Sequence, residues 1–193
     1  MTGALALYRD IGDQPGQADT LNDLGFLHVL TGDYAAATAS HQQALVLACS
    51  TGDRHAETHA LSNLGLVQQL TGDHAAAATS HQQALALFSD LGSLLGQAEA
   101  LNRLGELSSR TSATARARDY HTEALAIARD IRAPPEEARA LEGIGTSHLR
   151  DGNPGQADAY LRQALTISQR IGAPGAQRIE ETLRGPNLPD STE

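Results

Sequence analysis

The stretch "LTGDYAAATASHQQAL", residues 30–45, decides the fold because it recurs forty residues later as "LTGDHAAAATSHQQAL", residues 70–85. In both copies a Gly-Asp pair separates an apolar segment from a run of alanines. Glycine suits the left-handed conformation that ends many helices, and aspartate is a preferred N-cap of the helix that follows. The stretch therefore predicts a helix end, a hinge and a second helix that packs closely through small side chains.

The repeat continues beyond these two copies. Four glycines at a spacing of forty residues bring the strings "LNDLG", "LSNLG", "LNRLG" and "LEGIG" into register, and they are Gly25, Gly65, Gly105 and Gly145. A repeat of 20–50 residues is typical of a solenoid. Within the first unit, apolar spacing predicts one helix over residues 18–30. The inner face of the second helix is expected to hold Ala37, His41, Ala44, Leu45 and Ala48.

The register gives the domain organisation. A half repeat over 4–16 precedes four repeats and a capping helix at 174–185, with a disordered tail at 186–193. The repeats cover about 17–56, 57–96, 97–136 and 137–173. The half repeat lacks its first helix, so its apolar residues Leu5 and Ile11 are expected on the outer side. The third repeat replaces the Gly-Asp hinge, and there a looser turn capped by Ser112 or Thr114 is expected.

Composition restricts the partners. The net charge is -9, and Arg9 and Arg54 are the only arginines before residue 100 in a chain without lysine. Direct nucleic-acid binding needs clustered positive charge and is not expected. An acidic N-terminal half instead favours a partner with basic character. The single Cys49 and the absence of a long apolar run or signal peptide indicate a cytoplasmic protein with no membrane contact.

No pattern in the sequence indicates chemistry. The segment "HAETH" places His55 and His59 one helical turn apart, but its Glu is not in the order of a zinc protease and no third ligand follows. A solvated helix start is the preferred interpretation. His41, His81 and His121 stand at packing positions and are interpreted as core residues rather than pH sensors. We expect no enzymatic activity, no metal and no cofactor.

The repeated positions resemble the tetratricopeptide repeat. Leu21, the pair Leu24-Gly25 and Ala37 match its pattern and recur in each unit. The longer unit is similar to the extended repeats of kinesin light chains and of actinobacterial regulators, including the Streptomyces antibiotic regulatory protein family and signal-transduction ATPases. The use of Arg alone among basic residues, with abundant Ala and Gly, fits a high-GC bacterial source. The resemblance implies an all-α, right-handed solenoid of antiparallel helix pairs.

The resemblance also implies a function. In this family the first helices of the repeats line a concave groove that binds a peptide or partner helix. The groove positions singled out here are Asn22, Phe26, His59, Asn63, Asn102, Arg103, Glu106 and Arg139. An Asn amide both donates to and accepts from a peptide backbone, although Asn is also tolerated at half-exposed helix positions. Phe26 is either an exposed aromatic contact or a residue packed under the next repeat.

We therefore expect a non-catalytic module that binds a protein or peptide. The resemblance places it as the C-terminal sensor or interaction domain of a larger bacterial transcriptional regulator, whose DNA-binding part would precede Met1. The alternative is self-assembly, as a homodimer formed through the uncapped N-terminal helix.

Overall fold

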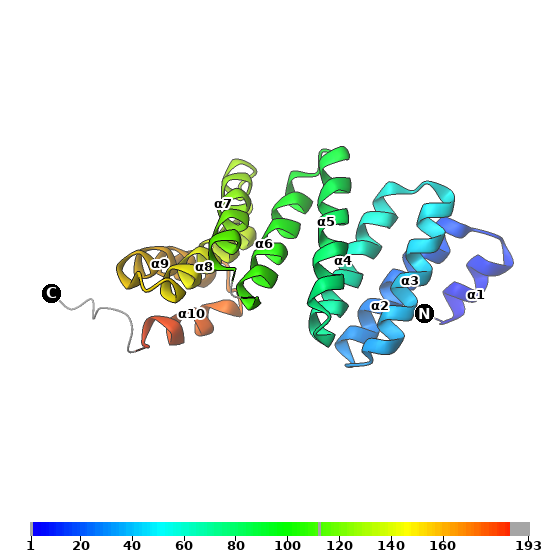
Figure 1. The fold of residues 1–193 in the computed structure, drawn as a ribbon. Helices are drawn as coiled ribbons and strands as arrows, with labels where there is room; N and C mark the ends of the chain where they lie inside the picture. Colours follow the sequence, from blue (N-terminus) through cyan, green and yellow to red (C-terminus); the bar gives the residue numbers. More distant parts are fainter. Residues whose placement is uncertain (1, 112, 186–193) are drawn as a thin grey trace. The chain divides into compact units, whose positions relative to one another are not determined.

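The computed structural model describes residues 2–111 and 113–185, and these residues form ten α-helices without a strand (Figure 1). Their bounds are α1 Thr2–Asp10, α2 Gln14–Leu30, α3 Tyr34–Thr51, α4 Arg54–Thr71, α5 His74–Asp90, α6 Leu94–Arg110, α7 Thr114–Asp130, α8 Pro134–Arg150, α9 Pro154–Arg170 and α10 Gly175–Leu183. The expected all-α fold is confirmed. Ser112 and the tail expected at 186–193 lie outside the described residues.

The turns between helices follow from the Gly-Asp pairs. Gly32 and Gly52 have φ angles of 78° and 70°, in the left-handed region where a residue with a Cβ is strained. The carboxylate of Asp33 accepts a hydrogen bond of 3.0 Å from the backbone N–H of Ala36. Asp53 caps α4 in the same way. The predicted hinge is therefore confirmed as a left-handed residue followed by an N-cap.

The turn before α7 departs from this pattern. Ala113 is its N-cap and makes no side-chain cap hydrogen bond. Thr114 is the first residue of the helix, and its hydroxyl donates to Asp151 Oδ1 at 2.7 Å. The expectation that Thr114 caps α7 was wrong, because the helix begins one position too early for its side chain to reach the free N–H groups.

The chain divides into two units, Met1–Gly92 with α1–α5 and Ser93–Glu193 with α6–α10. In unit 1, Leu5 of α1 is only 8% exposed and packs with Leu21, Ala44 and Ala60. The expectation that Leu5 faces outwards was therefore wrong, because α2 and α3 cover this side of α1. Ile11 is 64% exposed, as expected. In each unit the second helix of one pair packs on the first helix of the next, α3 on α4 and α7 on α8.

The last helix of unit 2 is α10, which packs against α9. The core of unit 2 includes buried apolar side chains from α6, α8 and α9, among them Leu101, Leu104, Leu141, Ile144 and Leu161. Ile179 of α10 is 1% exposed and packs on α9, while Glu181 faces water. Glu180 is only half-buried and accepts from the side chains of Gln169 and Arg184.

Buried histidines join the two helices of a pair. His41, His81 and His121 are each 1% exposed, which confirms their assignment to the core. The ring of each lies against the glycine of a Leu-Gly pair, so that a Cβ at Gly65 would lie 2.5 Å from His81 Cε1. Gly25 and Gly105 face His41 and His121 in the same way. The Leu-Gly motif is thus required by the imidazole that packs on it.

Candidate functional site

A groove in unit 1 runs between the first helices of two repeats, α2 and α4. It has a volume of about 460 Å³. We call it the unit 1 groove, and its lining residues are Asp19, Asn22, Asp23, Phe26, His59 and Asn63. The four residues on α2 share one face because their spacing of three, four and seven residues matches the helical period.

The surface of this groove combines an aromatic ring with carboxylates. Phe26 is 51% exposed, so it is not packed under the next repeat, and its ring is accessible as the other expectation required. Asp19 and Asp23 are exposed on either side of Asn22. Neither carboxylate forms an ion pair or hydrogen bond with another described residue. The groove therefore presents uncompensated negative charge beside an apolar face.

Asn22 connects the groove to the core. Its side chain is 8% exposed, and its Oδ1 lies 3.1 Å from Nδ1 of the buried His41. The amide oxygen can only accept, so this contact assigns the proton to Nδ1 of the imidazole. The Nδ2 group of Asn22 makes no hydrogen bond with any described residue, although the side chain lines the groove. Asn22 thus retains two N–H donors for a ligand.

The equivalent positions of unit 2 lie eighty residues later and hold a different chemistry. They are Glu99, Asn102, Arg103 and Glu106 of α6, with Arg139 of α8. Arg139 Nε donates to Glu106 Oε1 at 2.6 Å, and its Nη1 lies 3.8 Å from Glu136 Oε2. The Nδ2 of Asn102 donates to the Glu136 carboxylate at 2.8 Å and to its carbonyl oxygen at 3.1 Å. These groups satisfy one another.

The pKa values of the charged groups in unit 2 reflect burial and this pairing. Burial opposes the ionisation of Glu106, but the hydrogen bond and positive charge of Arg139 outweigh it and hold the pKa of Glu106 below its ordinary value. The pKa of Arg139 is raised, because Glu106 offsets the cost of burial. Burial and the like charge of Arg139 lower the pKa of Arg103. The arginine–glutamate pair is therefore ionised over the whole physiological range.

The predicted site residues thus fall into two sets. Asn22, Phe26, His59 and Asn63 line the unit 1 groove, while the set in unit 2 comprises Asn102, Arg103, Glu106 and Arg139. Asn63 does not continue the series of Asn22 and Asn102, since Ser62 stands at that position of the second repeat. Sequence reasoning missed Glu136, whose signal is a charged residue where the other repeats have Gly16, Ala56 and Gly96.

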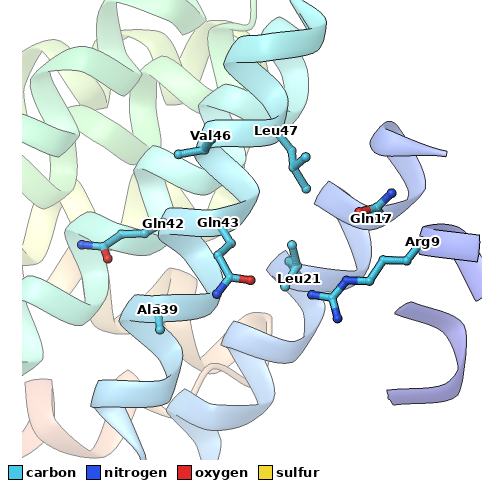
Figure 2. A pocket seen from close by; sticks show the side chains of 8 residues that line it. All are labelled: Arg9, Gln17, Leu21, Ala39, Gln42, Gln43, Val46 and Leu47. Carbon is cyan, nitrogen blue, oxygen red and sulfur yellow. The ribbon is translucent and has the colours of Figure 1, made fainter. Parts of the chain in front are cut away.

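A second pocket of about 460 Å³ in unit 1 opens on another side of α2, between α1 and α3. Figure 2 shows Leu21 and Leu47 pointing into it, with Arg9 reaching from α1 towards Leu21. Gln43 and the exposed Val46 of α3 complete this apolar pocket with a polar rim.

No set of three metal-binding side chains occurs within residues 2–111 and 113–185. His55 and His59, the pair of the "HAETH" segment, are both exposed near the start of α4. Over the same residues, none of the helices is both long and apolar enough to span a bilayer.

Family comparison accounts for most of the chain. Models described as "Tetratricopeptide repeat" match residues 17–51, 57–130 and 96–170. No curated protein matches the sequence.

Solved structures share the fold at low identity. BtubC (BKLC) from P. vanneervenii has 18% identity and a TM-score of 0.74, with 100% of this chain and 93% of that chain covered. The apo form of RapI has 11% identity and a TM-score of 0.87, with 96% and 68% covered. A Signal Transduction ATPase with Numerous Domains (STAND) protein with a tetratricopeptide repeat sensor, from Pyrococcus horikoshii, has 13% identity and a TM-score of 0.78. That match covers 89% of this chain and 26% of the STAND protein. The likeness is one of fold.

Proposed function

Because the chain belongs to the tetratricopeptide repeat family, whose repeats act as protein-interaction modules, we propose that it binds an extended peptide or partner helix and catalyses no reaction. The observation that carries this proposal is the unit 1 groove, where the exposed Phe26 lies beside Asp19, Asp23 and the Nδ2 group of Asn22, none of which bonds to another described residue. An exposed aromatic residue in a concave surface is a frequent energetic centre of binding.

The groove supplies what peptide binding needs. The Nδ2 group of Asn22 donates to a ligand carbonyl, and Asn63 on the facing helix offers both a donor and an acceptor. Phe26 contributes apolar contact that excludes water from these hydrogen bonds. In unit 2 the corresponding contacts would come from Asn102, Arg103, Glu106 and Arg139. There the ion pair between Arg139 and Glu106 would open, and both side chains would bind ligand groups instead.

The test is selection of peptides from a displayed random library on the full chain, followed by measurement of their affinity for variants. We expect Phe26→Ala with Asn63→Ala to weaken the selected peptides at least tenfold, a loss of about 1.4 kcal/mol. The control is Gln42→Ala with Gln82→Ala, because both glutamines are exposed on the second helices of their repeats. Equal binding to both double variants would contradict the concave site.

We further propose that the chain works in the cytoplasm as the C-terminal sensor or interaction domain of a larger, actinobacterial transcriptional regulator. The STAND protein from Pyrococcus horikoshii supports this proposal by analogy, since its tetratricopeptide repeat sensor is part of a longer chain. Sequencing the full gene and sizing its product with an antibody to this segment test it. A product of only 193 residues would contradict it.

Self-assembly is the second candidate, and α1 is the observation that favours it. Leu7 of α1 is 59% exposed and Ile11, in the turn after α1, is 64% exposed, which leaves an apolar surface available for a second copy. Light scattering over a dilution series tests the homodimer. We expect a dimer that Leu7→Ser with Ile11→Ser converts to monomer; a wild-type chain that is monomeric at every concentration would remove this candidate.

A further inference from the structure

We infer that the unit 1 groove takes up an arginine side chain of its peptide partner, with Asp19 and Asp23 accepting hydrogen bonds from the guanidinium and Phe26 lying against its plane. This inference rests on the proposed function, because it specifies which side chain the bound peptide presents. A comparison of the two units of the same chain supports it.

Unit 2 already holds an arginine at the corresponding place. Arg139 lies eighty residues after His59 and therefore occupies its position on the facing helix. There its guanidinium is bonded to Glu106 and lies near Glu136. In unit 2, therefore, a guanidinium on this face is surrounded by carboxylates, and Glu99 adds a further negative charge near it.

Unit 1 keeps one acidic position of this arrangement, lacks both of its arginines, and has Phe26 and Ala56 in place of Glu106 and Glu136. Asp19 corresponds to Glu99, Asp23 replaces Arg103, and His59 replaces Arg139. Neither arginine of unit 1 supplies the missing charge: Arg54 is paired with Asp90 at 2.7 Å, and Arg9 lines the pocket on the other side of α2. The groove is complementary to a positive charge that must come from a ligand.

A buried amide gives independent evidence that a ligand binds here. Asn22 is more than nine-tenths buried, lines the groove, and makes no hydrogen bond through its Nδ2 to any described residue. Its counterpart Asn102, held by the same contact to a histidine, donates Nδ2 to the main-chain carbonyl and carboxylate of Glu136. An Asn22 amide in the same setting is suited to the main-chain carbonyl of a peptide. The carboxylates on either side would then receive the side chain next to that carbonyl.

Arginine fits this surface better than lysine. Asp19 and Asp23 lie one helical turn apart, so a planar guanidinium can donate to both carboxylates at once. The guanidinium is also more weakly hydrated than an ammonium group and stacks on an aromatic face, which the exposed Phe26 provides.

The test is an NMR titration of the ¹⁵N-labelled full chain with two blocked pentapeptides, acetyl-Ala-Ala-Arg-Ala-Ala-amide and the same peptide with citrulline in place of arginine. Citrulline keeps the shape of arginine and removes its charge. We expect the arginine peptide to shift the amides of Asp19, Asp23 and Phe26 and to bind about tenfold more tightly than the citrulline peptide, as the loss of a charged hydrogen bond implies.

Matched variants assign the effect to the carboxylates. Asp19→Asn and Asp23→Asn should each remove the preference for arginine, whereas Asp10→Asn, which neutralises an exposed carboxylate on α1, should retain it. Equal affinity of the two peptides at the groove amides would overturn the arginine assignment and leave the peptide groove standing. Absence of shifts at these amides up to millimolar peptide, or shifts confined to unit 2, would overturn it as well. Failure of the proposed function is read separately, from the library-selected peptides.

Discussion

The Nδ1 atom of His121 lies 3.0 Å from Oδ1 of Asn102, and the same pair recurs at 3.1 Å between His41 and Asn22. In both pairs an asparagine of the first helix holds the ring that packs between the helices. The contact fixes the tautomer with its proton on Nδ1. Burial lowers the pKa of His41 and of His121 to about 4, so both rings are neutral at physiological pH.

We therefore predict that acid destabilises the protein in a defined window. In the unfolded chain these histidines titrate near 6.5, while in the folded chain their pKa is about 4. Between pH 6.5 and pH 4 the unfolded state binds more protons than the folded state. The contribution of these histidines to the free energy of unfolding is therefore fully present above pH 6.5 and falls as the pH drops towards 4. The loss is roughly 3 kcal/mol per histidine at the lower end.

Urea unfolding at a series of pH values measures this loss. His41→Leu, which copies the Leu161 found at this position in the fourth repeat, should flatten the pH dependence. Replacement of the exposed His55 by Asn should leave it unchanged. An equal slope in His41→Leu and the wild type would contradict this origin of the acid sensitivity.

For the glycine of the Leu-Gly motif, we predict that substitution by alanine changes stability in the direction opposite to that expected from helix propensity. Alanine normally stabilises a helix relative to glycine by about 1 kcal/mol. At Gly105 the new Cβ would lie 2.5 Å from Nε2 of His121, so Gly105→Ala should instead destabilise by about 1–3 kcal/mol.

The control for Gly105 is Gly155 of α9, where a Cβ would meet open space. Gly155→Ala should be neutral or stabilising in the same chemical denaturation experiment. Two alanine substitutions with the same effect would show that the imidazole does not enforce the glycine.

The two asparagines of the unit 1 groove should respond differently to alanine. Asn22→Ala removes the partner of a buried imidazole and should cost roughly 1–3 kcal/mol of unfolding free energy. Asn63 is half-buried and should change stability by less than about 0.5 kcal/mol while it weakens peptide binding. Thermal unfolding with a binding assay on each variant separates the roles, and equal destabilisation would contradict them.

Arg132 gives a prediction of increased stability. It has a φ angle of 54° at the turn position where other repeats have Gly52 and Gly92. Replacement of a residue with a Cβ by glycine in this conformation relieves backbone strain of about 1 kcal/mol. Arg132→Gly should therefore raise the midpoint of thermal unfolding, and Gly52→Arg should lower it. A lower midpoint of thermal unfolding for Arg132→Gly would contradict this prediction, because the side chain of Arg132 would then stabilise the fold by more than its backbone strain destabilises it.

The fold could be predicted from the sequence because its determinants are local and repeated. The pair Gly32-Asp33 specifies a turn through its own backbone and side-chain chemistry, and the forty-residue spacing extends that prediction to the other hairpins. Ala37 and His41 were identified as core residues from helical periodicity for the same reason. The prediction for Leu5 was wrong because burial of a terminal helix depends on how closely its neighbours cover it.

The site was less predictable, because its chemistry depends on side chains far apart in the sequence. The family resemblance predicts a groove position for Asn102 and Arg139, but it does not predict the hydrogen bonds that join them to Glu136 and Glu106 on the facing helix. Likewise, nothing local marks Asn22 as the partner of His41. The spacing of the repeats identified equivalent positions. Only the three-dimensional structure distinguished Asn22, whose Nδ2 bonds to no described residue, from Asn102, whose Nδ2 donates to Glu136.

The Arg139–Glu106 ion pair has a consequence for how binding would proceed in time. A cationic ligand that approaches unit 1 has only bound water to displace, whereas one that approaches unit 2 has to exchange an existing salt bridge. Encounter with such a ligand would therefore be faster at unit 1 than at unit 2.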